Sequence, residues 1–324
     1  TKKFHAVFSV HPFLTKYCFS LIQDICFISF LVGMRIPGEH SILSKINYKF
    51  MISQNINSNE KKYNVRLTKY RKAASYGTLL INSTFSNMKI NFFLRPNIKT
   101  IQSDVESLLK NTKVEPKFKK LGFLVLGGSK GIGLDIATHL ASLGLRVKAT
   151  YKSQKNYLSD RLIFLQKKDI YFEIDYYDNS NQNNINFEDY DVIINCITPK
   201  IMRGRKNEIS LKLFNDFSKN YLGDMITITK YLSNSNKKHL LVIPSSTAIN
   251  DLPIGMIEYA GAKAAMEIIA EGIEKMFSNI RLICPRIERV KTSQTLSIIN
   301  KGKSSAEVAI ELSDMILKNI EKII

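Results

Sequence analysis

The stretch Leu126-Gly127-Gly128-Ser129-Lys130-Gly131-Ile132-Gly133 decides the fold of most of this chain. The apolar run Phe123–Leu126 before it predicts a buried strand, and Gly131–Ser142 predicts a helix. Glycines at such a junction allow a tight turn and let backbone amides approach a pyrophosphate, which the positive end of the helix stabilises. A strand, a glycine-rich turn and a helix in this order indicate a dinucleotide-binding unit.

Short apolar segments alternate with helix-length segments through the rest of this region. After the glycine turn, the predicted strands are Arg146–Tyr151, Tyr171–Ile174, Val192–Asn195, Leu240–Pro244 and Arg281–Cys284. Alternation of this kind predicts a parallel sheet that is covered by helices on both faces. We therefore expect a doubly wound α/β domain of the Rossmann type over residues 120–324.

Two reactive side chains follow in Tyr259-Ala260-Gly261-Ala262-Lys263. A spacing of four residues puts the phenol and the ammonium on one face of a helix. A neighbouring cation favours phenolate and lowers the pKa of a tyrosine toward a value useful in acid–base catalysis. Taken alone, the motif is also what an ordinary Tyr/Lys pair on a solvated helix looks like.

Two further residues give this motif a context. Ser246 follows an apolar strand and lies 13 residues before Tyr259, and Asn220 lies in the preceding helical segment. With the glycine turn, the Asn–Ser–Tyr–Lys set and their order along the chain, residues 120–324 resemble a short-chain dehydrogenase/reductase. The resemblance implies that Tyr259 donates a proton to a carbonyl oxygen to which Ser246 also hydrogen-bonds. It also implies that Lys263 lowers the tyrosine pKa and holds the nicotinamide ribose, and that Asn220 anchors a water that relays protons to Lys263.

The choice of cofactor is read from the end of the second strand, Ala149-Thr150-Tyr151-Lys152-Ser153, which has no carboxylate for the ribose hydroxyls of NAD. Lys130 and Lys152 are available to a 2′-phosphate instead, so we expect NADP(H) rather than NAD. By resemblance, the cofactor contacts are Gly127, Ser129, Lys130, Gly131, Ile132, Gly133, Lys152, Asp175, Asn195, Tyr259 and Lys263.

Some positions depart from the family pattern. The usual Asn-Asn-Ala-Gly reads Asn195-Cys196-Ile197-Thr198 here, and the usual Pro-Gly after the sixth strand reads Pro285-Arg286. The threonine that follows is displaced, so Thr292 receives no role. These changes leave the catalytic set intact and put the substrate lid and the usual tetramer contacts in doubt.

Residues 1–98 predict a smaller α+β domain, followed by a linker over 99–119. A long apolar helix over Phe13–Met34 precedes three predicted strands, Ser41–Ile52, Lys62–Lys69 and Thr78–Ile90. The stretch Leu31-Val32-Gly33-Met34-Arg35-Ile36-Pro37-Gly38, with Ser41-Ile42 and Phe50 beyond it, resembles MaoC-like hotdog domains, in which a curved antiparallel sheet wraps a long helix.

The hydratase dyad of that family is not evident. Upstream of the helix stands only Ser9-Val10-His11-Pro12, without an aspartate, so His11 is interpreted as structural and Asp24 as a weak candidate. The first residue is Thr, which suggests that the chain begins inside a longer product. We therefore expect a hotdog domain truncated at its N-terminus, which either binds an acyl chain or dehydrates it.

Composition limits the partners and the location. The net charge is +19, but lysines are scattered among many Asn and Ile residues, which indicates compositional bias and not a nucleic-acid-binding face. Lys16, Gln23 and Asp24 inside the apolar helix argue against a membrane span. The four cysteines form no CxxC pair and accompany no His cluster, so we expect no metal site and buried thiols in a reducing, cytoplasmic compartment.

These observations together predict an NADPH-dependent reductase of a 3-oxoacyl thioester, carried by coenzyme A or an acyl carrier protein, in a homo-oligomer. The presence of a hotdog-like domain and a reductase domain in one chain is the reason for this choice of substrate, because reduction of a 3-oxoacyl thioester and dehydration of the 3-hydroxyacyl product are consecutive steps. Arg203, Arg205 and Lys206 are candidates for contact with the carrier, although a solvated loop is the simpler interpretation. Two alternatives stay open: a reductase of a sugar or secondary-metabolite ketone, and a non-catalytic nucleotide-binding protein.

Overall fold

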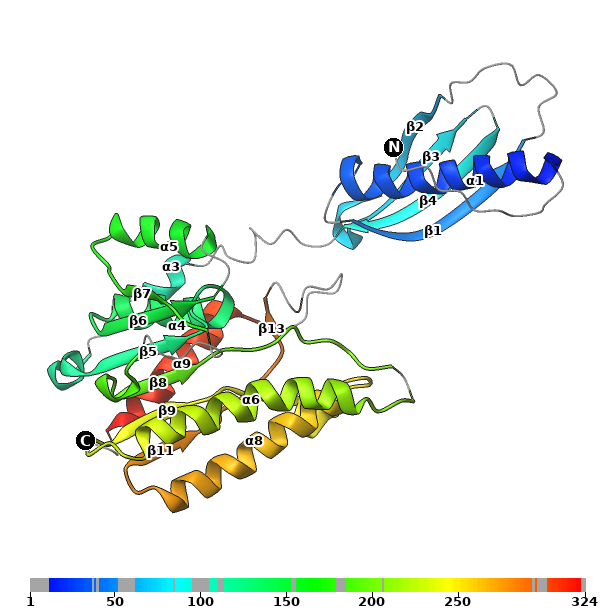
Figure 1. Cartoon of the computed structure of the whole chain (residues 1–324). Helices are drawn as coiled ribbons and strands as arrows, with labels where there is room; N and C mark the ends of the chain where they lie inside the picture. The colour runs from blue at the N-terminus through cyan, green and yellow to red at the C-terminus, as the bar shows by residue number, and fades with distance from the viewer. Residues whose placement is uncertain are drawn as a thin grey trace. The chain divides into compact units, whose positions relative to one another are not determined.

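A computed structural model describes residues 12–36, 38, 41–51, 62–83, 85–94, 105–109, 114–152, 156–178, 185–205, 207–292, 295 and 302–321. The chain divides into two compact units (Figure 1). One lies within Thr1–Asn97, and the other comprises Ile98–Leu296 with Lys301–Ile324. Each unit is described by itself below, as the N-terminal unit and the nucleotide-fold unit.

The nucleotide-fold unit is built on a six-stranded parallel sheet with the order β11-β9-β8-β5-β6-β7. The order reverses between β5 and β8, which creates the switch point where doubly wound folds bind ligands. The expected Rossmann-type parallel sheet is therefore confirmed. Its strands are β5 (Gly122–Leu126), β6 (Arg146–Tyr151), β7 (Glu173–Tyr176), β8 (Val192–Asn195), β9 (His239–Val242) and β11 (Ile280–Ile283).

Helices cover both faces of this sheet (Figure 1). Side chains alternate along β5, so that Phe123 and Val125 pack with α4 and α9, whereas Leu124 and Leu126 pack with α6 and α8. This is why the central strands are apolar without interruption. The long helices are α4 (Gly131–Ser142), α5 (Asn156–Gln166), α6 (Leu211–Leu232), α8 (Ile257–Met276) and α9 (Ser305–Ile320).

Short elements complete the unit. They are α3 (Val105–Leu108), η3 (Pro116–Lys120), η5 (Phe187–Asp189), β10 (Ser245–Ser246), α7 (Ala248–Asp251), β12 (Arg286–Ile287), β13 (Val290–Lys291) and β14 (Lys303–Ser304). Two of them come from the segment expected to be a linker. The carbonyl of Leu108 accepts hydrogen bonds from His139 and Ser142 at 2.7 and 3.0 Å, and its side chain lies in the core. The described parts of this segment, 105–109 and 114–120, thus pack as part of this unit.

The N-terminal unit is one long helix against a four-stranded antiparallel sheet with the order β1-β4-β3-β2. Buried side chains of both layers form its core, including Ile28, Leu79 and Phe92. A long helix against an antiparallel sheet is what the hotdog resemblance implies, and membership of that family stays a prediction. The elements are α1 (Pro12–Phe30), η1 (Leu31–Arg35), β1 (Ser41–Phe50), β2 (Asn64–Arg71), η2 (Lys72–Ala74), β3 (Tyr76–Asn82) and β4 (Ser86–Leu94).

The single strand expected over Thr78–Ile90 was wrong. It is a hairpin, because the hydroxyl of Ser83 accepts the amides of Phe85 and Ser86 at 3.2 and 3.1 Å and so ends β3 in a tight turn. The polar Asn82-Ser83-Thr84 cluster was the signal for that turn.

Asp24 of α1 is 0% exposed in the core of the N-terminal unit. Its carboxylate accepts hydrogen bonds from the hydroxyls of Tyr48, Tyr63 and Ser86 at 2.7 to 2.8 Å. Such a set satisfies a buried charge and ties the helix to the sheet. The other candidate here, His11, lies outside the described residues.

The expectation of buried thiols was wrong for Cys26, which is exposed on α1, while Cys196 and Cys284 are half-buried. Within the ranges given above, no helix combines the length and the apolar character needed to cross a bilayer.

Candidate active site

The glycine turn is shaped by two close approaches. Gly127 has a φ of +73°, which glycine adopts freely, and its amide donates to the hydroxyl of Thr150 at 3.1 Å. A Cβ on Gly133 would lie 2.5 Å from the carbonyl oxygen of Gly127. The first turn of α4 therefore fits directly against the end of β5, and its free amides open onto the turn. Ser129, Lys130 and Ile132 are half-buried there.

Two other segments adjoin the same turn. A Cβ on Gly127 would lie 3.0 Å from the backbone of Cys196, just after β8. A Cβ on Gly131 would lie 3.7 Å from the methyl group of Thr292. Thr292 received no role from the sequence because its spacing departs from the family pattern, yet the fold returns it to the turn.

The charged residues at the ends of β6 and β7 are paired with one another. The Nζ atom of Lys152 lies 2.7 Å from Oδ1 of Asp178, and 64% of the lysine side chain is exposed. An ion pair this exposed is weak, so Lys152 can exchange its partner for a phosphate. Asp175 accepts the amide of Tyr176 at 2.8 Å and lies 4.0 Å from Lys148.

Ser246 and Tyr259 are brought together. Ser246 lies in β10, beyond the carboxyl end of β9, and its hydroxyl faces the phenol of Tyr259 at the start of α8 closely enough to lower the pKa of that phenol. Tyr259 is 9% exposed. Burial raises the pKa of Tyr259, and the nearby hydroxyl of Ser246 opposes that rise. The pair can present two hydroxyls to one oxygen atom.

Lys263 lies in a different contact from the one expected. Its Nζ atom donates to the carbonyl of Pro244 at 2.7 Å and lies 3.7 Å from the ring centroid of Tyr221. Burial lowers the pKa of Lys263 to about 8. Among the described residues no contact joins this ammonium to the phenol of Tyr259, so the expected lowering of the tyrosine pKa by Lys263 is not seen. The ring of Tyr221 contacts both residues, meeting Tyr259 edge to face at 6.0 Å.

Asn220 is not joined to the other three. Its side-chain amide donates to the carbonyl of Asp216, one turn earlier in α6, at 2.8 Å. Of the expected catalytic set, the structure therefore brings together Ser246 and Tyr259, links Lys263 to them through Tyr221, and leaves the Asn220 side chain on its own helix.

Two buried residues of α6 were missed by the sequence reasoning. Tyr221 hydrogen-bonds Thr198 at 2.8 Å, and Asp224 is 2% exposed and lies near the side chain of Asn195. Oδ1 of Asp224 has no partner, and burial raises the pKa of Asp224 to about 7. A signal was present, because Asp224 lies on the same apolar stripe as Tyr221 and Ile228, where a carboxylate is out of place.

The loop after β8 is tied to the start of α8. The amide of Gly204 donates to the carbonyl of Gly255, and the amide of Ser210 donates to Oε1 of Glu258, both at 2.8 Å. Arg203 and Arg205 lie exposed on this loop. Lys206, the third basic residue singled out in the sequence, lies outside the described residues.

Comparison with known proteins finds likeness in structure only. No family model matches the sequence, and no curated protein matches it. A short-chain dehydrogenase/reductase from Serratia marcescens is 16% identical, with a TM-score of 0.51 and a match that covers 61% of this chain and 91% of that one. A short-chain dehydrogenase from Burkholderia cenocepacia, solved with NADP, is 17% identical, with a TM-score of 0.50 over 61% of this chain and 91% of that one.

A third structure, described as a short-chain dehydrogenase from Shigella flexneri complexed with NADP, is 16% identical, with a TM-score of 0.52 over 62% of this chain and 92% of that one. Identities this low show a shared fold. The nucleotide-fold unit therefore has the fold of these short-chain dehydrogenases.

Proposed function

We propose that this chain is an NADPH-dependent reductase that converts a 3-oxoacyl thioester, on an acyl carrier protein or coenzyme A, to the 3-hydroxyacyl thioester. The observation that carries the proposal is that the hydroxyl of Ser246 faces the phenol of Tyr259 beyond the carboxyl ends of a parallel sheet. That is the side on which doubly wound folds bind ligands. The NADP complexes of two structural neighbours support the choice of cofactor for the fold.

The glycine turn fits a dinucleotide. A Cβ would collide at Gly133 and be crowded at Gly127, and the first amides of α4 have no partner within the helix, so a helix start of this kind suits an anion. In this proposal Gly127, Ser129, Gly131 and Ile132 hold the pyrophosphate. Lys130 and Lys152 hold the 2′-phosphate, Lys152 giving up Asp178 to do so. When bound, the cofactor supplies the hydride.

The chain's own residues supply the proton and the orientation. The Ser246 hydroxyl hydrogen-bonds the substrate carbonyl oxygen and aligns it with the phenol. Tyr259 donates its proton to that oxygen as negative charge develops there. Lys263, whose pKa burial lowers to about 8, holds the nicotinamide ribose.

The substrate class rests on the N-terminal unit. Its helix and antiparallel sheet suit a hotdog-like domain that binds the acyl group or dehydrates the 3-hydroxyacyl product. Asp24 is already satisfied by three hydroxyls, which favours acyl binding over dehydration by this segment alone.

The test is consumption of NADPH by the full chain, followed by absorbance, with acetoacetyl thioesters of coenzyme A and of an acyl carrier protein. We expect turnover that depends on the thioester and is slower with NADH. A matched panel of sugars and simple ketones identifies a non-thioester reductase, which would ignore coenzyme A thioesters as competitors. Absence of turnover with the whole panel would end the proposal.

One observation favours a second candidate, a protein that binds the nucleotide without turnover. Lys263 donates to the carbonyl of Pro244 and lies over the ring of Tyr221. It does not lower the pKa of the Tyr259 phenol. Tight NADPH binding, measured by fluorescence, together with no reduction of any carbonyl, would establish this candidate in place of the first.

A further inference from the structure

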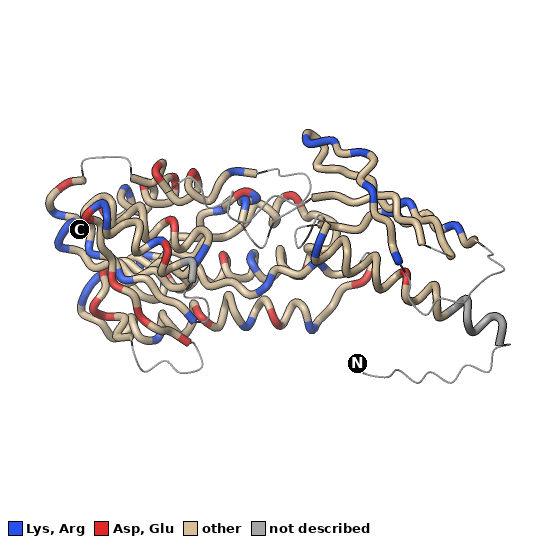
Figure 2. The backbone as a smooth tube through the Cα atoms, turned by 90° about the horizontal axis from the view of Figure 1, so that it is seen from above, with Lys and Arg blue, Asp and Glu red and all other residues tan. Residues whose placement is uncertain are grey.

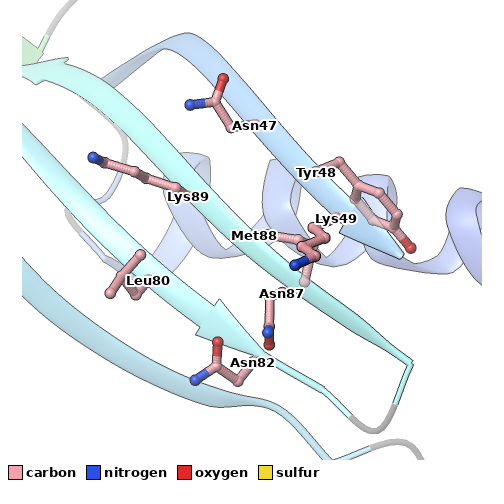
Figure 3. Close-up of a pocket in the computed structure, with 8 residues that line it drawn as sticks. All are labelled: Asn47, Tyr48, Lys49, Leu80, Asn82, Asn87, Met88 and Lys89. Atoms are coloured by element: carbon pink, nitrogen blue, oxygen red, sulfur yellow. The ribbon is translucent and has the colours of Figure 1, made fainter. Parts of the chain in front are cut away.

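The cationic side chains of the N-terminal sheet lie on one face. Strand register puts Lys49 opposite Asn87, and Lys89 opposite Asn47 and Leu80, while the alternate residues Tyr48 and Met88 point to the α1 side. We call the face away from α1 the outer sheet face (Figure 3). Strand register assigns to it every Lys and Arg of the four strands, namely Lys45, Lys49, Arg66, Lys69, Arg71 and Lys89. Arg66 and Lys69 share this face because the register of β2 shifts between Leu67 and Lys69.

Among the described residues, no carboxylate balances the charge of the outer sheet face. The four strands contain no Asp or Glu, and the only carboxylate among the described residues of this unit, Asp24, is 0% exposed. Within the part of the chain that the structure describes, none of the six cations forms an ion pair. Residues 1–97 hold 14 Lys and Arg against 3 Asp and Glu. Positions of both charges along the chain are marked in Figure 2.

The outer sheet face also carries a hollow of about 220 Å³. Amide and ammonium donors surround it, as Figure 3 shows. Six of its lining residues belong to the outer sheet face, namely Asn47, Lys49, Leu80, Asn82, Asn87 and Lys89, and Tyr48 and Met88 of the same strands complete the lining. Lysine offers three N–H donors and asparagine two, so the lining suits carboxylate groups that arrive from a partner.

We propose that the outer sheet face docks an acidic protein, and that this protein is the carrier of the acyl thioester. The inference rests on the proposed function for the identity of the partner and on the charge of the face for its chemistry. Six cations that form no ion pair with any described residue attract a negatively charged surface and speed its encounter.

Two other polyanions fit the face less well. Single-stranded RNA needs open aromatic rings, whereas Tyr76 and Phe93 of this face pack against each other at 5.1 Å. An anionic membrane needs bulky apolar groups to insert, and Leu80, the large apolar side chain at the hollow, is only 37% exposed. A protein surface rich in carboxylates requires neither.

The experiment measures binding of a purified holo acyl carrier protein to the full chain by fluorescence anisotropy. The test variant is Lys49→Glu with Lys89→Glu. The matched control is Lys212→Glu with Lys230→Glu, which makes the same change in net charge on exposed positions of α6. We expect the test variant to bind about tenfold or more weakly and the control to stay within about threefold of the unchanged chain. Binding should also weaken as salt rises.

Three outcomes would overturn the inference: no binding of the carrier, equal weakening by both double variants, or tighter binding of poly(U) RNA or phosphatidylglycerol vesicles through the same lysines. Lys45→Gln with Lys49→Gln replaces the test variant if circular dichroism shows a loss of fold. Reduction of a small acetoacetyl thioester is measured separately. Binding of the carrier without turnover would refute the proposed reaction but not the docking inference. Turnover without binding of the carrier would refute the docking inference but not the proposed reaction.

Discussion

The ammonium nitrogen of Lys263 lies 3.7 Å from the ring centroid of Tyr221, and both side chains are buried. The ring face carries negative charge density, so it stabilises the cation in a place where burial opposes charge. The same ring meets Tyr259 edge to face. Tyr221 is therefore a positioning residue that connects two members of the proposed site.

Replacing Tyr221 by Leu should shift the pKa of Lys263 further down from about 8. A desolvated cation–π contact contributes about 2 kcal/mol, and its loss corresponds to about 1.5 pKa units. The pH dependence of NADPH binding should move to lower pH by that amount. Tyr221→Phe, which keeps the ring and loses only the hydrogen bond to Thr198, is the control. Identical pH profiles for the two variants would contradict the assignment.

Tyr259→Phe should reduce turnover by a factor of about 10² to 10⁴ and leave NADPH affinity within about threefold, because the proton donor is lost and the fold is kept. Ser246→Ala should lower turnover as well, since it removes the hydroxyl that aligns the carbonyl. The matched control is Tyr171→Phe, a change at an exposed tyrosine. Full activity in Tyr259→Phe would refute the proposed chemistry.

Gly133→Ala should abolish NADPH binding. The new Cβ would lie 2.5 Å from the carbonyl oxygen of Gly127, so α4 must move away from the turn that holds the pyrophosphate. The control is Gly272→Ala in α8, where a new Cβ would have no neighbouring atom within 4 Å. It should raise stability by about 0.5–1 kcal/mol through helix propensity. Titration with NADPH and thermal unfolding of both variants test these expectations. An unchanged NADPH affinity in Gly133→Ala would contradict the assignment of the glycine turn as the pyrophosphate site.

Asp224 should make the protein less stable as the pH rises from about 4 to about 7. Burial raises its folded pKa to about 7 from the ordinary 3.8, so in this window the folded state holds more protons than the unfolded state and loses them with rising pH. Asp224→Asn should remove that slope and add on the order of 2–4 kcal/mol of stability at about pH 8.

Urea unfolding at a series of pH values measures this effect of Asp224. Asp216→Asn, at an exposed position of the same helix, serves as the control and should keep the slope of the unchanged chain. A slope that survives in Asp224→Asn would show that Asp224 is not its source.

Asp24→Asn should destabilise the N-terminal unit by about 2–3 kcal/mol, because an amide cannot accept all three hydroxyl hydrogen bonds. Burial and the bond to Asp24 raise the pKa of Tyr48 to about 12, so its phenol should ionise at lower pH in the variant. Ultraviolet absorbance during alkaline titration reports this shift. Gln23→Ala, next to it on the exposed side of α1, should change neither property.

Local patterns in the sequence determined much of the architecture. The limits of α4, β6 and β8 agree with the expected ones, because a glycine turn and short segments rich in apolar residues are signals contained within each segment. The four-residue and 13-residue spacings likewise selected Tyr259, Lys263 and Ser246 before any contact was visible. The hairpin between β3 and β4 was not predicted, because apolar and β-branched residues on both sides of the short polar turn were interpreted as one strand.

Tertiary structure alone decided what each side chain contacts. Helical spacing places Lys263 and Tyr259 on one face, but only the packing of α6 against α8 supplies Tyr221 as the partner of the ammonium. Sheet register, in the same way, gathers scattered lysines onto one outer face and pairs Lys152 with Asp178. Sequence spacing sets the direction of a side chain within its own element, whereas its partner comes from another segment that folding brings within a few ångströms.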